Sequence, residues 1–108
     1  AVGTGDDDIA TAVNRVMRER GGLSVASQRD HLNKVLPLPI AGLMATGTCR
    51  EVGTAYSNLE AQVKQLGSQL RAPYMTLAFM ALLVIPELKL SDLGLFDGVR
   101  FKLIPLMT

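Results

Sequence analysis

The side chains of this sequence that could carry out chemistry are few. The chain has one histidine, His31, and one cysteine, Cys49. A hydrolytic metal site needs several His, Cys or carboxylate ligands that converge on one ion. A site made by this chain alone would therefore need mainly carboxylates, and their only cluster is Asp6, Asp7 and Asp8.

The three aspartates stand directly before a helical pattern. Side chains of consecutive helical residues point about 100° apart, so the three cannot all face one ion. Acidic residues in a first turn cap free N–H groups and suit the positive end of the helix dipole. We therefore predict that Asp6, Asp7 and Asp8 form a helix cap, and we expect no metal ligand in this chain. A contact at the rim of a site, or an outer-sphere role, is the alternative.

The other catalytic patterns are weaker. His31 lies in the polar stretch 28–31, where a solvated turn histidine is the simpler interpretation. Cys49 lies beside an expected helix start, which favours a thiolate, but no histidine is near it in the sequence. Gly3-Thr4-Gly5 before a helix suggests a phosphate loop, yet the full G-x-G-x-x-G pattern is absent and the aspartates would repel a phosphate. We predict no catalytic residue in this chain.

Two amphipathic helices are expected to position these residues. Apolar side chains at spacings of three and four predict a helix over residues 6–20. A four-three alternation from Val52 to Leu70 predicts a second helix over about 50–69. Thr48 and Glu51 have the spacing of a capping box at its start.

The remaining segments predict strands and one ambiguous element. Residues 23–27 and 32–36 indicate a β-hairpin closed by a four-residue loop. Residues 74–84 fit a helix or a buried strand about equally, and the preceding proline favours the helix. Alternation at 88–90 and at 101–104 predicts two further strands. We therefore expect an α+β fold in which two or three helices pack on a small, mostly antiparallel sheet.

The composition indicates one globular domain over residues 1–108, with 48% hydrophobic and 19% charged residues. The net charge is +1 and the basic residues are scattered, so we expect no nucleic-acid partner. The longest apolar run, 77–85, is shorter than the roughly 20 residues that span a bilayer, so we expect no membrane partner. We interpret this run, with Met75 and Met80, as buried core. The lone cysteine and the lack of a signal-peptide pattern favour the cytoplasm.

The segment from Leu36 to Met44 is strongly apolar but contains two prolines. Each proline removes a backbone donor, so the segment can be at most the tail of an edge strand. An extended apolar loop needs a cover, which is another layer of its own domain or a surface outside the chain. We expect an interface formed by Leu36, Pro37, Leu38, Pro39, Ile40, Leu43 and Met44.

Several strings of the sequence resemble one known family. They are VGTGDDDI at 2–9, LPLPIAGLM at 36–44 and LLVIPELKLSDLGLFD at 82–97. In this order they resemble the C-terminal domain of microbial adenine deaminase, of the amidohydrolase superfamily, and the resemblance covers essentially the whole chain. One departure is Gly5, where the family often has Asn.

The resemblance implies a cytoplasmic, metal-dependent enzyme of purine salvage and adenine catabolism that hydrolyses adenine to hypoxanthine and ammonia. In this family an upstream barrel holds a divalent metal, which is manganese, iron or zinc, through His and carboxylate ligands. The barrel and its ligands are not in this chain, so we expect no cofactor here and no activity of the 108 residues alone. The expected partners are the remainder of the deaminase chain or a second subunit, in a homo-oligomer. The alternative is a stand-alone binding or oligomerisation module that shares only this domain.

Overall fold

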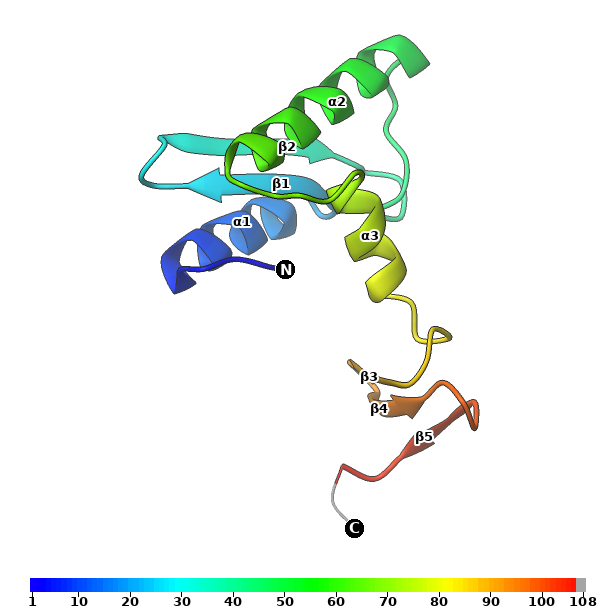
Figure 1. Cartoon of the computed structure of the whole chain (residues 1–108). Helices are drawn as coiled ribbons and strands as arrows, with labels where there is room; N and C mark the ends of the chain where they lie inside the picture. Colours follow the sequence, from blue (N-terminus) through cyan, green and yellow to red (C-terminus); the bar gives the residue numbers. More distant parts are fainter. Residues whose placement is uncertain (107–108) are drawn as a thin grey trace. The chain divides into compact units, whose positions relative to one another are not determined.

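The computed structural model describes residues 1–106, which form three helices and two small antiparallel sheets (Figure 1). The helices are α1 (Asp6–Arg18), α2 (Cys49–Gln65) and α3 (Pro73–Met80). The strands are β1 (Gly22–Ser27), β2 (Leu32–Pro37), β3 (Leu88–Ser91), β4 (Gly94–Asp97) and β5 (Lys102–Ile104). The expected α+β class is confirmed, with the antiparallel strands divided between two sheets.

The chain divides into two compact units. Unit 1 is Ala1–Pro73, and unit 2 begins at Tyr74. Unit 1 holds α1, α2 and the hairpin, while unit 2 holds the sheet β3-β4-β5 and all of α3 after its first residue. That the two units together form one domain stays a prediction.

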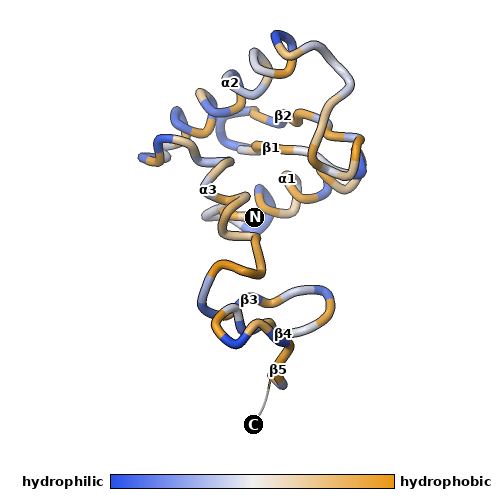
Figure 2. Tube along the Cα trace, turned by 90° about the vertical axis from the view of Figure 1, so that its right-hand side faces the viewer, coloured by the Kyte–Doolittle hydropathy of each residue, from blue (hydrophilic) through white to orange (hydrophobic). Residues whose placement is uncertain are grey.

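In unit 1 the β1–β2 hairpin lies between two helices. Figures 1 and 2 show α1 on one face and α2 on the other, and both helices contact the strands. The Ser24 hydroxyl donates a hydrogen bond to the carbonyl of Ala12 at 2.8 Å, which ties one face to α1. Val25 and Leu36 lie on the opposite face and are buried, as is Leu59 of α2. The core of unit 1 therefore lies between the hairpin and α2.

The two long helices were predicted correctly but end earlier than expected. The backbone N–H groups of Arg20 and Gly21 donate to Met17 and Val16, and Arg20 has a φ of +59°. This is a Schellman cap with arginine in the left-handed position that glycine usually takes. At the end of α2, Gly67 takes that position with a φ of +106°. The helix therefore stops at Gln65 instead of reaching residue 69.

The hairpin has the predicted strands and loop. Its register pairs Leu23 with Leu36 and Ser27 with Leu32. The loop ends on His31, which has a left-handed φ of +51°. The capping box at the start of α2 is also confirmed. The Glu51 carboxylate accepts the N–H of Thr48 at 2.8 Å, and the Thr48 hydroxyl accepts the N–H of Glu51 at 3.3 Å.

In unit 2, the ambiguous segment is a helix, as the proline position favoured, but it ends at Met80. The interpretation of residues 77–85 as buried core is wrong, because Leu77, Phe79 and Val84 are exposed. Met75 and Met80 are exposed as well, so they fill no gap in a core. Figure 2 shows the strongly hydrophobic segment that follows α3. Among residues 1–106, no helix has the length and hydropathy needed to cross a membrane.

The sheet of unit 2 is a three-stranded meander in the order β3-β4-β5. The expected strands at 88–90 and 101–104 correspond to β3 and β5. The sequence did not predict β4, because its residues Gly-Leu-Phe-Asp lack alternation. Hairpin geometry places β4 between the other two strands, where it pairs with both.

Candidate functional site

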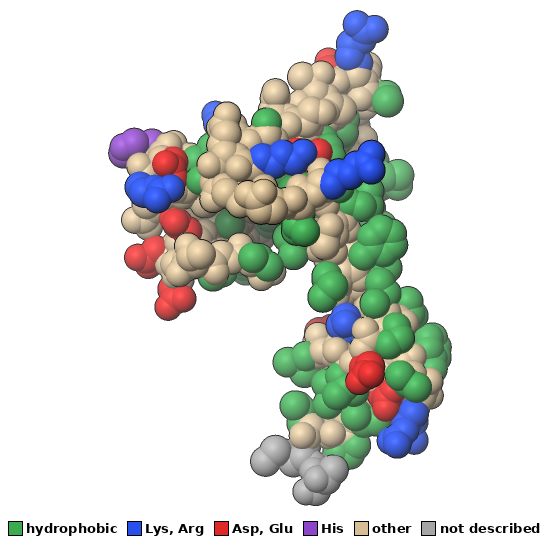
Figure 3. All heavy atoms as spheres, viewed as in Figure 1, with side chains coloured by type: hydrophobic (Ala, Val, Ile, Leu, Met, Phe, Trp, Pro, Cys, Tyr) green, Lys and Arg blue, Asp and Glu red, His purple; other side chains and the backbone are tan. Residues whose placement is uncertain are grey.

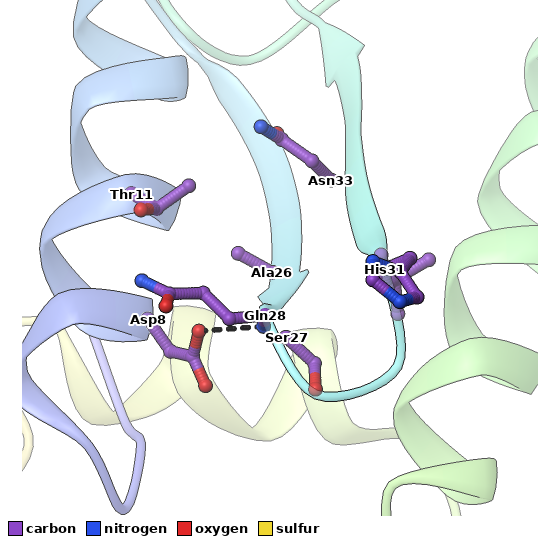
Figure 4. A pocket seen from close by; sticks show the side chains of 8 residues that line it. Asp8, Thr11, Ala26, Ser27, Gln28, His31 and Asn33 are labelled. Carbon is purple, nitrogen blue, oxygen red and sulfur yellow. Dashed lines mark hydrogen bonds between the residues drawn. The ribbon is translucent and has the colours of Figure 1, made fainter.

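A shallow hollow of about 290 Å³ lies where α1 meets the hairpin loop, and it is the candidate for a site. It is lined by Asp8, Thr11, Ala26, Ser27, Gln28, His31, Leu32 and Asn33 (Figure 4). Asp8 and Thr11 come from α1, and the other residues come from β1, β2 and the loop between them. This hollow brings together Asp8 and His31, two of the residues that the sequence singled out.

Asp8 connects the first turn of α1 to the hairpin. Its Oδ1 accepts the backbone N–H of Gln28 at 2.9 Å, as the dashed line in Figure 4 marks. The N-cap residue itself is Gly5, and no side chain makes a capping hydrogen bond at this described helix end. Asp6, Asp7 and Asp8 occupy the first turn instead. Any stabilisation of the helix end by the aspartates must therefore come from their charge, which suits the helix dipole.

His31 and Ser27 do not form a catalytic pair. The Ser27 hydroxyl donates to Asp30 Oδ2 at 2.6 Å, and the N–H of Asp30 donates back to that hydroxyl at 3.3 Å. The hydrogen bond from Ser27, followed by that from Arg29, lowers the pKa of Asp30. The serine oxygen is thus used to stabilise the turn, and His31 lies exposed at the end of the loop.

Cys49 and the acidic residues form no metal centre in the described part of the chain. Cys49 is an exposed free thiol at the first residue of α2. Among residues 1–106, no three His, Cys, Asp or Glu side chains converge on a point where they could hold an ion. In the candidate hollow, the described side chains include no serine paired with a histidine, because the Ser27 hydroxyl is bonded to Asp30.

The proline segment begins inside the hairpin. Pro37 is the last residue of β2, so the prediction of an edge-strand tail is confirmed. Leu36 is buried in the core of unit 1, which removes it from the expected interface. Its burial follows from the register, because Leu36 lies on the same face of the hairpin as Val25 and contributes to the core against α2.

Beyond β2 the segment folds into a small turn. Ile40 and Met44 form an isolated antiparallel bridge, and Leu43 donates its N–H to the carbonyl of Ile40 at 3.0 Å. Leu38 is half-buried, Ile40 and Met44 are exposed, and Leu43 at the tip is 76% exposed. The turn therefore presents three large apolar side chains on a constrained backbone.

Pro37 has no backbone N–H, and its position in the hairpin determines whether a hydrogen bond is lost. Leu38 donates its N–H to the carbonyl of Gly21 at 3.1 Å, so Leu38 faces β1. In an antiparallel pair, the backbone N–H and C=O groups of alternate residues point away from the partner strand. Pro37 is therefore at an outward position, where its missing N–H costs no hydrogen bond of the hairpin. The sequence alone did not reveal this, because the alternation depends on the register.

Residues 1–102 match the family described as Adenine deaminase C-terminal domain. A protein of Methanosarcina mazei named adenine deaminase is 48% identical over 106 residues. Proteins of the same name from Salinibacter ruber and a Sulfurovum species are each 51% identical over 105 residues.

The comparisons cover nearly all of this chain but little of each relative. The matches span 98% of the chain with the Methanosarcina mazei protein and 96% with the other two. The chain spans only 19% of the length of each of these curated relatives. Since the family match extends over almost the whole sequence, the chain belongs to the adenine deaminase C-terminal domain family.

Proposed function

We propose that this chain is the C-terminal assembly region of an adenine deaminase, a cytoplasmic enzyme of purine salvage that converts adenine and water to hypoxanthine and ammonia. The observation that carries the proposal is the match to adenine deaminases at 48–51% identity over almost all of the chain. The catalytic activity belongs to the longer protein, of which these residues are about one fifth.

The divalent metal of such an enzyme, manganese, iron or zinc, would be held outside this region. The described ligand-type residues do not fit it: Asp8 accepts a backbone N–H, Asp30 is bonded to Ser27, and Cys49 lies apart on α2. We therefore assign these side chains no step of the deamination.

In this proposal the region contributes to the assembly of the enzyme by packing against other parts of it. The turn formed by Ile40, Leu43 and Met44 exposes apolar side chains at a fixed geometry. Such a surface is more apolar than a small domain usually leaves in water. We propose that this turn packs against the remainder of the deaminase chain or against a second subunit of a homo-oligomer.

The experiment that tests the function uses the full-length protein. Purified protein loaded separately with manganese, iron or zinc is incubated with adenine, and both hypoxanthine and released ammonia are measured. Equal amounts of the two products are expected, with adenosine as the control substrate. The absence of turnover with every metal, in a protein whose metal content has been verified, would contradict the proposal.

A further inference from the structure

The sheet of unit 2 has one aliphatic face. Residues paired across antiparallel strands project to the same side. Leu90 pairs with Leu95, which in turn pairs with Ile104, and Leu88 lies two residues before Leu90 on the same side. We call the surface of Leu88, Leu90, Leu95 and Ile104 the aliphatic face.

The opposite side of the sheet is mixed in character. Along β3 it carries Lys89 and Ser91, so this strand alternates between apolar and polar residues. Its aromatic residue, Phe96, already has a partner within unit 2. The ring of Phe101 meets it edge to face, with the ring centres 5.4 Å apart. The alternation of β3 therefore predicts that the aliphatic face is the side of the sheet that packs against other protein.

Unit 2 leaves the β3 part of the aliphatic face in water, while Leu95 and Ile104 are half-buried. Leu88 is 52% exposed and Leu90 is 70% exposed. In the described part of unit 2, Tyr74 is the only buried residue, and Figure 3 shows many hydrophobic side chains on the surface of this unit. A unit of this size rarely forms a stable core without outside help. The hairpin of unit 1, in contrast, has a helix on each face.

Two charged residues project to the same side of the sheet as the aliphatic face: Asp97, which pairs with Leu88, and Lys102, which pairs with Asp97. Asp97 Oδ1 accepts the backbone N–H groups of Val99 and Arg100 at 2.9 and 2.8 Å. Its Oδ2 lies 3.8 Å from Arg100 Nε, and Asp97 pairs across the strands with Lys102. The row formed by Leu90, Leu95 and Ile104 has no charged side chain, so an apolar surface suits this part of the face.

We propose that the aliphatic face docks against an apolar surface of the same chain, in the part of the adenine deaminase that precedes this region. The inference rests on the proposed function, because it requires the longer chain. The matched relatives are about five times as long as this region, so under the proposed function the longer chain has residues that could cover this face. Linkage in one chain gives a high local concentration that a second copy lacks.

The test is site-specific photo-crosslinking in the full-length protein. The photoreactive amino acid p-benzoyl-phenylalanine replaces Leu90, and in a matched control it replaces Leu93. Leu93 is 77% exposed, three residues away, and lies in the β3–β4 turn outside the aliphatic face. Thermal unfolding checks that each variant is folded, and Leu88 is the second labelling site if the variant at Leu90 is not.

After irradiation, the crosslinked peptides are identified by mass spectrometry. A crosslink from position 90 to a peptide upstream of Ala1 in the same chain is expected, with at least a fivefold lower yield from position 93. A crosslinked dimer on a denaturing gel would overturn the inference in favour of a second copy. A crosslink to residues 1–73 would assign the face to unit 1, and no crosslink would show that the face is open.

The result can be separated from the proposed function. The deamination assay is run on the unmodified full-length protein, so failure to act on adenine would refute the function without changing the crosslinking pattern. An active deaminase that gives no intrachain crosslink from position 90 would instead refute only the docking of the aliphatic face.

Discussion

At the scale of single residues, Asp8 has a role that its neighbours Asp6 and Asp7 do not share. All three lie in the first turn of α1, but Asp8 alone accepts a hydrogen bond from the hairpin loop, through Gln28. The negative charges of the other two act on the helix dipole, an effect of about 0.3–1 kcal/mol that salt screens.

The first prediction compares substitutions of these aspartates. Asp8→Ala removes the acceptor for the Gln28 amide and is expected to cost about 0.5–1.5 kcal/mol locally, which accelerates hydrogen exchange at that amide several-fold. Asp7→Ala is the matched control, and its smaller effect should disappear in high salt. Equal exchange rates at Gln28 in the two variants would contradict this account.

The second prediction concerns the acid titration of the capping box. The hydroxyl of Thr48, followed by its backbone N–H, holds the pKa of Glu51 below its ordinary value of 4.5. A lowered pKa in the folded state means that the cap is fully stabilising above about pH 4.5 and is lost as the pH falls through the lowered value. Thr48→Ala should move the titration of Glu51 back toward the ordinary value.

Carboxyl NMR chemical shifts followed against pH measure this titration directly. Thr54→Ala is the control, because Thr54 is a threonine of the same helix outside the capping box. If the midpoint of Glu51 were the same with Thr48→Ala as without it, the hydroxyl would not be the cause of the lowered pKa.

At the scale of elements, the turn after β2 is a rigid apolar projection. Its backbone is held by the bridge between Ile40 and Met44, and Pro39 restricts the residues before it. A constrained turn loses little conformational freedom when it docks. The buried Leu36, in contrast, belongs to the fold of unit 1.

The third prediction is that Leu43→Asp weakens the full-length assembly. Burying a leucine is worth roughly 1.5–3 kcal/mol, so placing a charge at this position should lower the melting temperature and disturb the oligomeric state. Met17→Asp on α1 is the control, because Met17 is 68% exposed, close to the 76% of Leu43. Gel filtration and thermal unfolding that do not distinguish the two variants would reject an interface at the turn.

At the scale of the whole molecule, the described part of the chain has few buried and many exposed large hydrophobic residues. The buried hydrophobic residues are Val25, Leu36, Leu59 and Tyr74. Both units have exposed large hydrophobic side chains. In the described part of unit 2, most of the large hydrophobic side chains are exposed. This distribution is typical of a region that is covered by other protein.

The fourth prediction is that these 108 residues alone do not deaminate adenine. Their described His, Cys and carboxylate side chains do not converge on a metal-binding point, so no metal-activated water can form among them. The purified region is incubated with adenine and manganese, iron or zinc, beside a metal-only blank. Hypoxanthine formation above the blank that survives repurification would refute the prediction.

The sequence by itself determined the local elements of this protein. Side-chain spacing identified α1 and α2, the Thr48–Glu51 spacing identified a cap, and the polar stretch at 28–31 identified the hairpin loop. These features depend on residues within a few positions of one another, whose periods of 3.6 and 2 are visible in the chain. The segments that resemble the adenine deaminase family are also runs of consecutive residues, so the resemblance was visible in the sequence.

Only the tertiary structure decided what depends on contacts between distant residues. The register fixed the outward position of Pro37 and the burial of Leu36, neither of which is encoded by spacing within one strand. The sequence also did not predict the exposure of residues 77–85, because a helix buried in a core and a surface that binds other protein can have the same apolar composition. Hydrophobicity specifies that a side chain leaves water, and the arrangement of the whole protein decides where it goes.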